Sequence, residues 1–271
     1  MAAELTPQAE VADIPTPPRD LPYDDGEPLE SNRHRIAMNV LIDSLHTAFA
    51  EREDYFVGGN MFLYYSQDQA MNRDFRGPDF FAVLQVDGRK ERKYWAIWEE
   101  SGRYPDVIIE LMSASTRTID LVDKKELYAN TFRTPEYFVY DPFAADSLQG
   151  WRLGGQGAYQ AQTPDERGWL WCEILGVWLG VWQGELLRET APWLRFYDPA
   201  GSLILLPVEQ AARERQRAEQ AEAAWQTEHQ ARLEAITRLL ALGLSPAEVA
   251  GALAVPLDQV EQMRARPTPG P

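Results

Sequence analysis

The residues that could carry out chemistry in this chain are mainly carboxylates on segments whose composition predicts buried strands. Asp79 stands at the opening of one such segment, and Glu110 lies in the middle of another, VIIELMS (107–113). Because successive side chains of a strand point to opposite faces, Glu110 shares its face with Ile108 and Met112. An ionised carboxylate there is unfavourable unless it is paired or holds a metal ion. A buried salt bridge, or a place at the rim of the sheet, is the alternative interpretation.

A second group of polar residues follows Glu110 along the chain. In TRTIDLVDKKELY (116–128), Asp120, Lys124 and Tyr128 stand at positions i, i+4 and i+8, which form one stripe of a helix. Lysine is scarce, with four in the whole chain, against 22 arginines. A helix leaving the strand of Glu110 could bring the Lys124 ammonium to the same place. On the residues alone, a surface Asp120–Lys124 ion pair, with Tyr128 packed in the core, is the favoured interpretation.

Other chemistries find little support in the sequence. No G-x-x-x-x-G-K-[ST] phosphate loop occurs, and no dinucleotide-binding motif follows a predicted strand. The stretch LGGQG (153–157) is not followed by a helical pattern, so it predicts a plain turn. Cys172 lies in an apolar, Trp-rich stretch typical of a core thiol. Three histidines stand outside any nucleophile-elbow context: His34, His46 and His229.

The elements that would position these residues alternate between helical and strand patterns. Periodicity predicts helices over 32–50 and 116–132, strands over 54–65, 76–88, 105–113 and 134–142, and β structure over 148–187. The strand over 54–65 is one strand, or two separated at Gly58-Gly59. Residues 89–104 form an edge strand or a loop, and Gly154-Gly155 indicates a hairpin. This order predicts an α/β fold around a mostly buried sheet, with a β-rich extension.

The chain ends differ from this middle region. We expect an acidic, Pro-rich arm over 1–28, one domain over 29–207, a long helix over 208–242, and a short helical hairpin with a tail over 243–271. The long helix keeps 3–4 spacing only at Leu233, Ile236 and Leu240, so a short dimerising coiled coil and a solvated appendage both stay open. Ser245 and Glu248 form a predicted capping box. The hairpin resembles the opening of a helix-turn-helix without a basic third helix.

Composition limits the function classes. The chain has 271 residues, with 26 Lys and Arg against 42 Asp and Glu, a net charge of −16. The composition excludes a protein that binds nucleic acid through a uniformly basic surface. Because much of the acidic excess lies in residues 1–30, it does not exclude a nucleic-acid substrate. A single cysteine excludes an internal disulfide and a Cys-rich zinc site, and predicts an intracellular, cytoplasmic protein. The longest apolar run, 174–182, is too short to span a membrane, and no signal peptide is predicted.

Several short motifs follow one another in a specific order. They are GPD (77–79), IELMSAST (109–116), DLVDK (120–124) with Tyr128, and TPEYFVYDP (134–142), preceded by GEPLESNRHRI (26–36). Over roughly residues 22–205 the chain resembles the Uma-type restriction-endonuclease-like family, a branch of the PD-(D/E)XK nuclease superfamily. The resemblance implies a PD-(D/E)XK nuclease-like fold, with a central mixed sheet of four strands flanked by helices.

The resemblance also implies roles for single residues. Asp79 and Glu110 would be ligands of a divalent metal, Mg²⁺ or Mn²⁺, and Lys124 would be the catalytic base or a charge stabiliser. Glu30 is a secondary candidate for the metal site, and Asp120 would fix the helix start or orient Lys124. In one respect the sequence departs from the superfamily, because Met112 stands two residues after the glutamate, where a lysine is usual.

The function implied is Mg²⁺-dependent endonuclease activity on nucleic acid, with DNA as the expected substrate. The alternative is a nuclease-fold scaffold with weak or no catalysis, which acts as a regulatory or partner-binding module. DNA binding is expected to be weak and salt-sensitive because few basic residues are available, and a homodimer is expected to help cutting of two strands. The expected phosphate contacts are Arg33, Arg35, Arg73, Arg76, Arg89 and Arg117.

Overall fold

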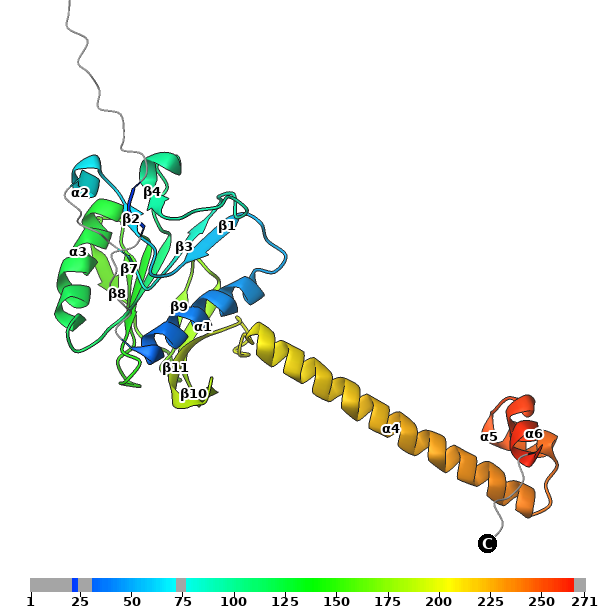
Figure 1. The fold of residues 1–271 in the computed structure, drawn as a ribbon. Helices are drawn as coiled ribbons and strands as arrows, with labels where there is room; N and C mark the ends of the chain where they lie inside the picture. Colours follow the sequence, from blue (N-terminus) through cyan, green and yellow to red (C-terminus); the bar gives the residue numbers. More distant parts are fainter. Residues whose placement is uncertain (1–20, 24–30, 72–76, 266–271) are drawn as a thin grey trace, which may run out of the picture. The chain divides into compact units, whose positions relative to one another are not determined.

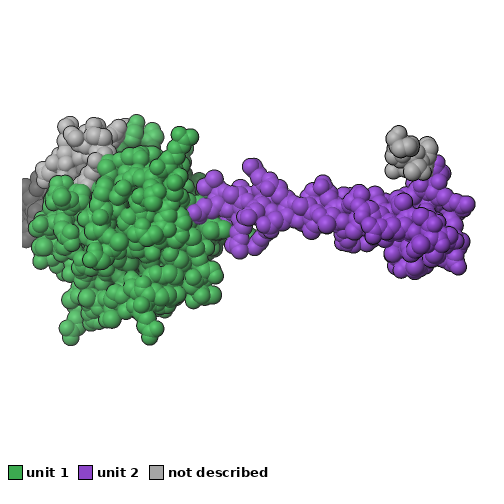
Figure 2. Space-filling model, turned by 90° about the horizontal axis from the view of Figure 1, so that it is seen from below, with its two compact units in different colours: residues 1–207 green, residues 208–271 purple. Residues whose placement is uncertain are grey.

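The computed structural model describes residues 21–23, 31–71 and 77–265. The chain divides into two compact units, residues 1–207 and 208–271, which Figure 2 shows in different colours. Within the described ranges, every helix is too short or too polar to cross a lipid bilayer. The two units are described separately below.

A six-stranded mixed sheet forms the centre of the first unit (Figure 1). Its strand order is β1-β3-β5-β6-β7-β8. The strands are β1 Tyr55–Gly58, β3 Phe80–Leu84, β5 Val107–Leu111, β6 Glu136–Tyr140, β7 Gln149–Leu153 and β8 Tyr159–Ala161. The β5–β6 pair is parallel and the other four pairs are antiparallel. The predicted α/β fold with a central mixed sheet flanked by helices is therefore confirmed.

One face of this sheet packs against helix α1 (Asn32–Ala48) and a second, three-stranded sheet. The second sheet has the order β11-β10-β9, with β9 Leu170–Cys172, β10 Val177–Leu186 and β11 Glu189–Tyr197. Ser31 caps α1, because its hydroxyl accepts a hydrogen bond from the backbone N–H of His34. The β-rich region thus has two parts: β7 and β8 widen the central sheet, and β9–β11 form a separate layer.

The other face is covered by residues 119–132. This segment runs through a π-helical part (Ile119–Lys124), the short α3 (Lys125–Leu127) and a second π-helical part (Tyr128–Phe132). Tyr128 and Phe132 pack there against Ile108 of β5 and Tyr137 of β6. A regular helix over 116–132 was the expectation; the observed segment is helical but wound more loosely, a feature often found at functional sites.

Short elements complete the first unit. Strand β2 (Leu63–Tyr64) pairs in parallel with β4 (Trp95–Ala96), and they are accompanied by α2 (Gln67–Met71) and a 3₁₀ turn (Ile97–Glu99). Residues 54–65 therefore hold two strands in different sheets, and 89–104 is mostly loop. The break falls at Gly59, where a Cβ atom would lie 2.5 Å from the backbone oxygen of Asp79. Only glycine allows the chain to pass so close beneath Asp79.

The second unit consists of α4 (Pro207–Ala241), α5 (Pro246–Leu253) and α6 (Leu257–Ala265). The predicted capping box is present, since the Ser245 side chain accepts from the Glu248 N–H and Glu248 bonds back to the Ser245 N–H. Ile236, at the end of α4, is fully buried in a small core with Val249 and Val260. Two of the three regularly spaced apolar residues of the long helix, Ile236 and Leu240, thus pack inside their own unit.

Candidate active site

Asp79 and Glu110 lie side by side at one end of the central sheet. Asp79 immediately precedes β3, and the antiparallel pairing of Phe80 with Ile109 brings it next to β5. The Leu111 N–H donates to Asp79 Oδ2 at 2.8 Å, and the Asp79 N–H donates to Glu110 Oε2 at 3.4 Å. The two carboxyl groups also interact directly. Strand pairing, rather than a flexible loop, therefore fixes their separation.

Lys124 reaches the same place from the helical segment above the sheet. Its Nζ lies 3.0 Å from Glu110 Oε2 and 2.8 Å from Asp120 Oδ1. The Glu110 and Asp120 side chains are 0% and 1% exposed, whereas that of Lys124 is 23% exposed. The structure thus brings Asp79, Glu110, Asp120 and Lys124 together, and solvent approaches them from the side of Lys124.

Two buried tyrosines contact this cluster. The Tyr128 hydroxyl donates to Glu110 Oε1 at 2.7 Å, and the Tyr137 hydroxyl donates to the backbone oxygen of Asp120 at 2.8 Å. The sequence predicts Tyr128 on the stripe with Lys124 and packed in the core. It predicts neither the hydrogen bond of Tyr128 to Glu110 nor the contact of Tyr137 with Asp120. In an α-helix, side chains four residues apart differ in direction by about 40° around the helix axis. The more slowly winding π-helical parts offset this difference and keep the stripe turned toward Glu110.

The charges of the cluster do not balance. Three carboxyl groups face one ammonium group, that of Lys124. Burial, and next the negative charge of Glu110, raise the pKa of Asp79 well above its usual range, although Lys124 and the Leu111 N–H oppose this. Burial would lower the pKa of Lys124, but the surrounding carboxylates outweigh it and raise that pKa. Excess negative charge is therefore concentrated between Asp79 and Glu110.

A divalent cation fits this donor set. Mg²⁺ prefers oxygen ligands, and it commonly binds to one or two carboxylates while keeping several waters. Asp79 and Glu110 offer two such carboxylates, and burial and the charge of Glu110 make ionisation of Asp79 unfavourable unless a cation is bound beside it. Within residues 21–23, 31–71 and 77–265, no group of three or more His, Cys, Asp or Glu side chains has an arrangement suited to a metal ion. The two carboxylates are thus the candidate ligands.

The other predicted site residues have varied positions. Glu30, Arg73 and Arg76 lie outside the described residues. His34 has a structural place, since its Nε2 lies 3.2 Å from the Met112 backbone oxygen and its Nδ1 lies 2.9 Å from Ser31 Oγ. It ties the start of α1 to the end of β5.

The described arginines do not gather at the site. Arg33 pairs with Glu189, Arg35 bonds to Asn32, and Arg117 lies 3.9 Å from Asp141. Arg89 pairs with Glu53, which precedes β1, and β1 begins where β3 ends. Arg89 therefore lies at the far end of β3 from Asp79. Arg117 is the member of this set on the segment that leads from β5 to Asp120.

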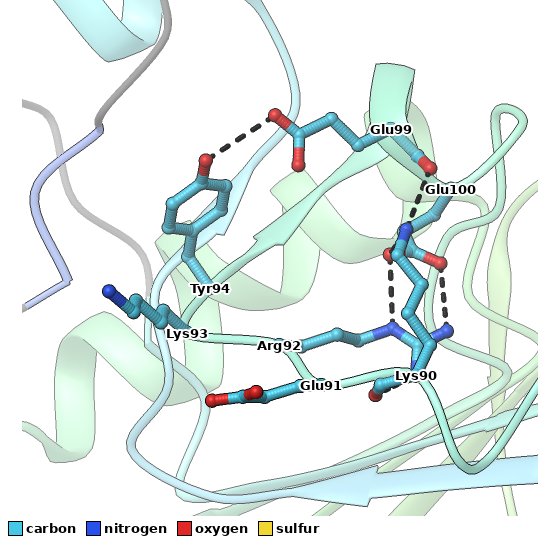
Figure 3. A pocket seen from close by; sticks show the side chains of 7 residues that line it. All are labelled: Lys90, Glu91, Arg92, Lys93, Tyr94, Glu99 and Glu100. Atoms are coloured by element: carbon cyan, nitrogen blue, oxygen red, sulfur yellow. Dashed lines mark hydrogen bonds and ion pairs between the residues drawn. The ribbon is translucent and has the colours of Figure 1, made fainter.

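A polar pocket of about 470 Å³ lies along the basic stretch 89–93 (Figure 3). Lys90 and Arg92 both point to Glu100, at 2.7 and 3.0 Å. Burial opposes ionisation of Glu100, but hydrogen bonds from Arg92 and Lys90 lower its pKa below the usual value. Lys90 and Arg92 thus share one carboxylate, so the cations outnumber the carboxylate they contact, whereas in the cluster around Glu110 the carboxylates are in excess.

The chain is similar to a family model and to a solved structure. The Uma2 family model, described as "putative restriction endonuclease", matches residues 9–181. A solved structure described as a putative nuclease belonging to DUF820, from Anabaena variabilis ATCC 29413, is similar with a TM-score of 0.39 and 11% sequence identity, over 56% of this chain and 81% of that chain. The search of curated proteins gave no match. The family match spans well over half of the chain, which therefore belongs to the Uma2 family of restriction-endonuclease-like proteins.

Proposed function

We propose that this protein is a Mg²⁺-dependent endonuclease that hydrolyses phosphodiester bonds in DNA. The observation that carries the proposal is the convergence of Asp79, Glu110 and Lys124, which come from three separate stretches of chain. Buried carboxylates in excess over cations are unfavourable on their own, and such an arrangement is typical of functional sites. Membership of a restriction-endonuclease-like family supports the same reaction class.

In this proposal Asp79 and Glu110 hold the metal ion. A divalent ion bound there would polarise the phosphate and lower the pKa of the attacking water. Lys124 lies beside Glu110 on the more exposed side of the cluster and would stabilise negative charge on the phosphate oxygens. Asp120 lies within 2.8 Å of the Lys124 Nζ and would orient the ammonium.

The proposed substrate class follows from the charge of the site. A phosphodiester is an anion, and it would meet the carboxylates only through the cation and Lys124. Two of the expected phosphate contacts, Arg33 and Arg89, are paired with acidic residues, so we expect DNA binding to be weak and to fall steeply with salt. Arg117, near the entrance of the helical segment, is the proposed phosphate contact, since its partner Asp141 is 3.9 Å away.

The test is DNA cleavage by the purified full chain. Plasmid, linear duplex and single-stranded DNA are incubated with Mg²⁺, with Mn²⁺ or with a chelator. Lys124→Ala is compared with Lys125→Ala, because the two residues are neighbours but Lys125 Nζ lies over the Trp151 ring at 4.1 Å, away from the cluster. We expect metal-dependent nicking by the wild type and by Lys125→Ala, and a loss on the order of 10²–10⁴ for Lys124→Ala.

The opposite result would favour the scaffold function. If the wild type cuts no better than Lys124→Ala or Asp79→Ala on any of these substrates, the proposed activity fails. A homodimer and a cytoplasmic location also remain proposals. Sedimentation at several concentrations tests the dimer, and a monomer at all concentrations would contradict it; fractionation of cells that make the protein tests the location.

A further inference from the structure

The two oxygens of the Glu110 carboxylate have different partners. Oε1 accepts a hydrogen bond from the Tyr128 hydroxyl at 2.7 Å. Oε2 faces the Lys124 ammonium at 3.0 Å and the Asp79 N–H at 3.4 Å. The carboxylate therefore has one oxygen held from the helical segment and one oxygen turned toward Asp79 and Lys124.

Tyr128 is itself held in place. It is fully buried, and its ring contacts Phe132 and Tyr137 with centroid distances of 5.2 and 5.3 Å. The hydroxyl thus has a fixed position, and the Glu110 carboxylate lies within its reach across the interface between β5 and the helical segment. A neutral phenol placed this way can orient an acceptor, and it adds no charge to the cluster.

We propose that Tyr128 is a positioning residue for the metal-binding carboxylate. This inference rests on the proposed function, because it takes Glu110 as a metal ligand. By holding Oε1, the Tyr128 hydroxyl fixes the rotation of the carboxylate, so that Oε2 stays directed toward the cation site beside Asp79. Outer partners that orient metal ligands in this way contribute about 10–100-fold to metal affinity or activity.

The test measures Mn²⁺ binding directly, from the signal of free Mn²⁺ in electron paramagnetic resonance, on the full chain without DNA. Tyr128→Phe keeps the ring and removes the hydroxyl. Tyr140→Phe is the matched control: Tyr140 is also fully buried, and its hydroxyl donates to the Pro192 backbone oxygen at 3.0 Å on the other face of the sheet. We expect Tyr128→Phe to bind Mn²⁺ about 10–100-fold more weakly, and Tyr140→Phe to bind it as the wild type does.

A double-mutant cycle separates positioning from general stability. On a Glu110→Ala background, the Tyr128→Phe substitution should change the residual Mn²⁺ affinity by less than about twofold, because the hydroxyl then has no carboxylate to orient. Should Tyr128→Phe fail to fold, Tyr128→Met provides a second variant, whose flexible apolar side chain can fill the buried site without a hydrogen-bond donor, and which is expected to bind Mn²⁺ as weakly.

The outcomes distinguish this inference from the proposed function. If the wild type binds Mn²⁺ and Asp79→Ala does not, but Tyr128→Phe binds as the wild type does, the positioning role is wrong and the metal site stands. Equal weakening by Tyr140→Phe, or an undiminished effect of Tyr128→Phe on the Glu110→Ala background, would also overturn it. If the wild type binds no Mn²⁺, the proposed function and this inference fall together.

Discussion

Two fully buried glutamates lie on neighbouring strands of the central sheet, and their surroundings differ. Glu110 of β5 faces the helical segment, while Glu136 of β6 faces β9 on the other side. Glu136 is surrounded by donors at 3.0–3.1 Å: Cys172 Sγ, the Glu173 and Ile174 backbone N–H groups, and two guanidinium nitrogens of Arg152. Glu110 has a hydroxyl, one backbone N–H and one ammonium, and it shares these surroundings with Asp79 and Asp120.

The difference separates a structural carboxylate from a candidate metal ligand. Donors surround Glu136, and the single charge of Arg152 balances it, so the group links β6 to β9 and needs nothing further. Around Glu110 the carboxylates outnumber the cations, and burial together with the negative charge of Glu110 raises the pKa of Asp79. Both glutamates are fully buried, so burial does not distinguish them; the charges of the groups around each carboxylate do.

The comparison is tested most strongly by making both glutamates neutral without changing their shape. We expect Glu110→Gln to lower the cleavage rate by on the order of 10²–10⁴, because the amide binds a cation poorly. Glu136→Gln, assayed with the same DNA below its unfolding temperature, should keep most of the activity. Equal losses in the two variants would contradict the division of roles.

The two substitutions should affect stability in the reverse order, with Glu136→Gln the more destabilising. Glu136→Gln removes the charge that accepts from Arg152 and from two backbone N–H groups, so we expect the free energy of unfolding to fall by about 2 kcal/mol, the size typical of hydrogen bonds to a charged group. The cost stays below that of breaking a fully buried pair, because Arg152 is half-exposed and water can solvate it. Glu110→Gln should cost less, because it relieves repulsion with Asp79. Urea unfolding followed by circular dichroism measures both values, and an unchanged midpoint for Glu136→Gln would argue against its structural role.

Substitution of Asp79 is expected to change the free energy of unfolding less, and to stabilise the protein instead of destabilising it. Since its pKa is raised in the folded protein, the ionised carboxylate destabilises the fold at neutral pH, and Asp79→Asn should stabilise the metal-free protein by about 1 kcal/mol. This gain should shrink as the pH falls below the ordinary range of carboxyl groups, where Asp79 is protonated whether folded or not.

Without metal, Asp79→Asn should be more stable than the wild type; added Mn²⁺ should make the wild type the more stable of the two. The ion binds the folded wild type and raises its unfolding temperature with concentration. The Asp79→Asn variant lacks one ligand and should respond little. Thermal unfolding with a chelator and with a Mn²⁺ series gives the comparison, and identical Mn²⁺ responses would rule Asp79 out as a ligand.

Local patterns were sufficient to predict much of this site. The alternation around Glu110 gave its face correctly, because the period of a strand is strict. The spacing of Asp120, Lys124 and Tyr128 gave their common stripe, but on the residues alone a surface ion pair was the favoured interpretation, and the approach of Lys124 to Glu110 was expected from the resemblance to a family. The proximity of Asp79 depends on the β3–β5 register, which a single strand pattern does not encode. It was expected only from the resemblance to a family.

Other features depend on contacts between distant segments. The contact of Tyr137 with Asp120 requires both the β6 register and the π-helical winding of residues 119–124, and neither has a local signal. Gly58-Gly59 did indicate a break, but not that β1 and β2 enter different sheets. Likewise, Glu136 lies in the matching motif 134–142 without a predicted role, because its partners lie 16 to 38 residues further along the chain.

The smallest expected effect concerns Cys172, one of the donors to Glu136. Its thiol is fully buried, and burial together with the charge of Glu136 raises its pKa well above the usual value, so it should stay protonated and unreactive toward alkylating reagents in the folded protein. Cys172→Ala removes one donor of five and should lower the free energy of unfolding by about 1 kcal/mol, with no change in cleavage. Mass spectrometry after alkylation, with and without urea, follows the thiol. Rapid labelling of the folded protein would mean that reagents reach the surroundings of Glu136, and it would contradict the structural role assigned to this carboxylate.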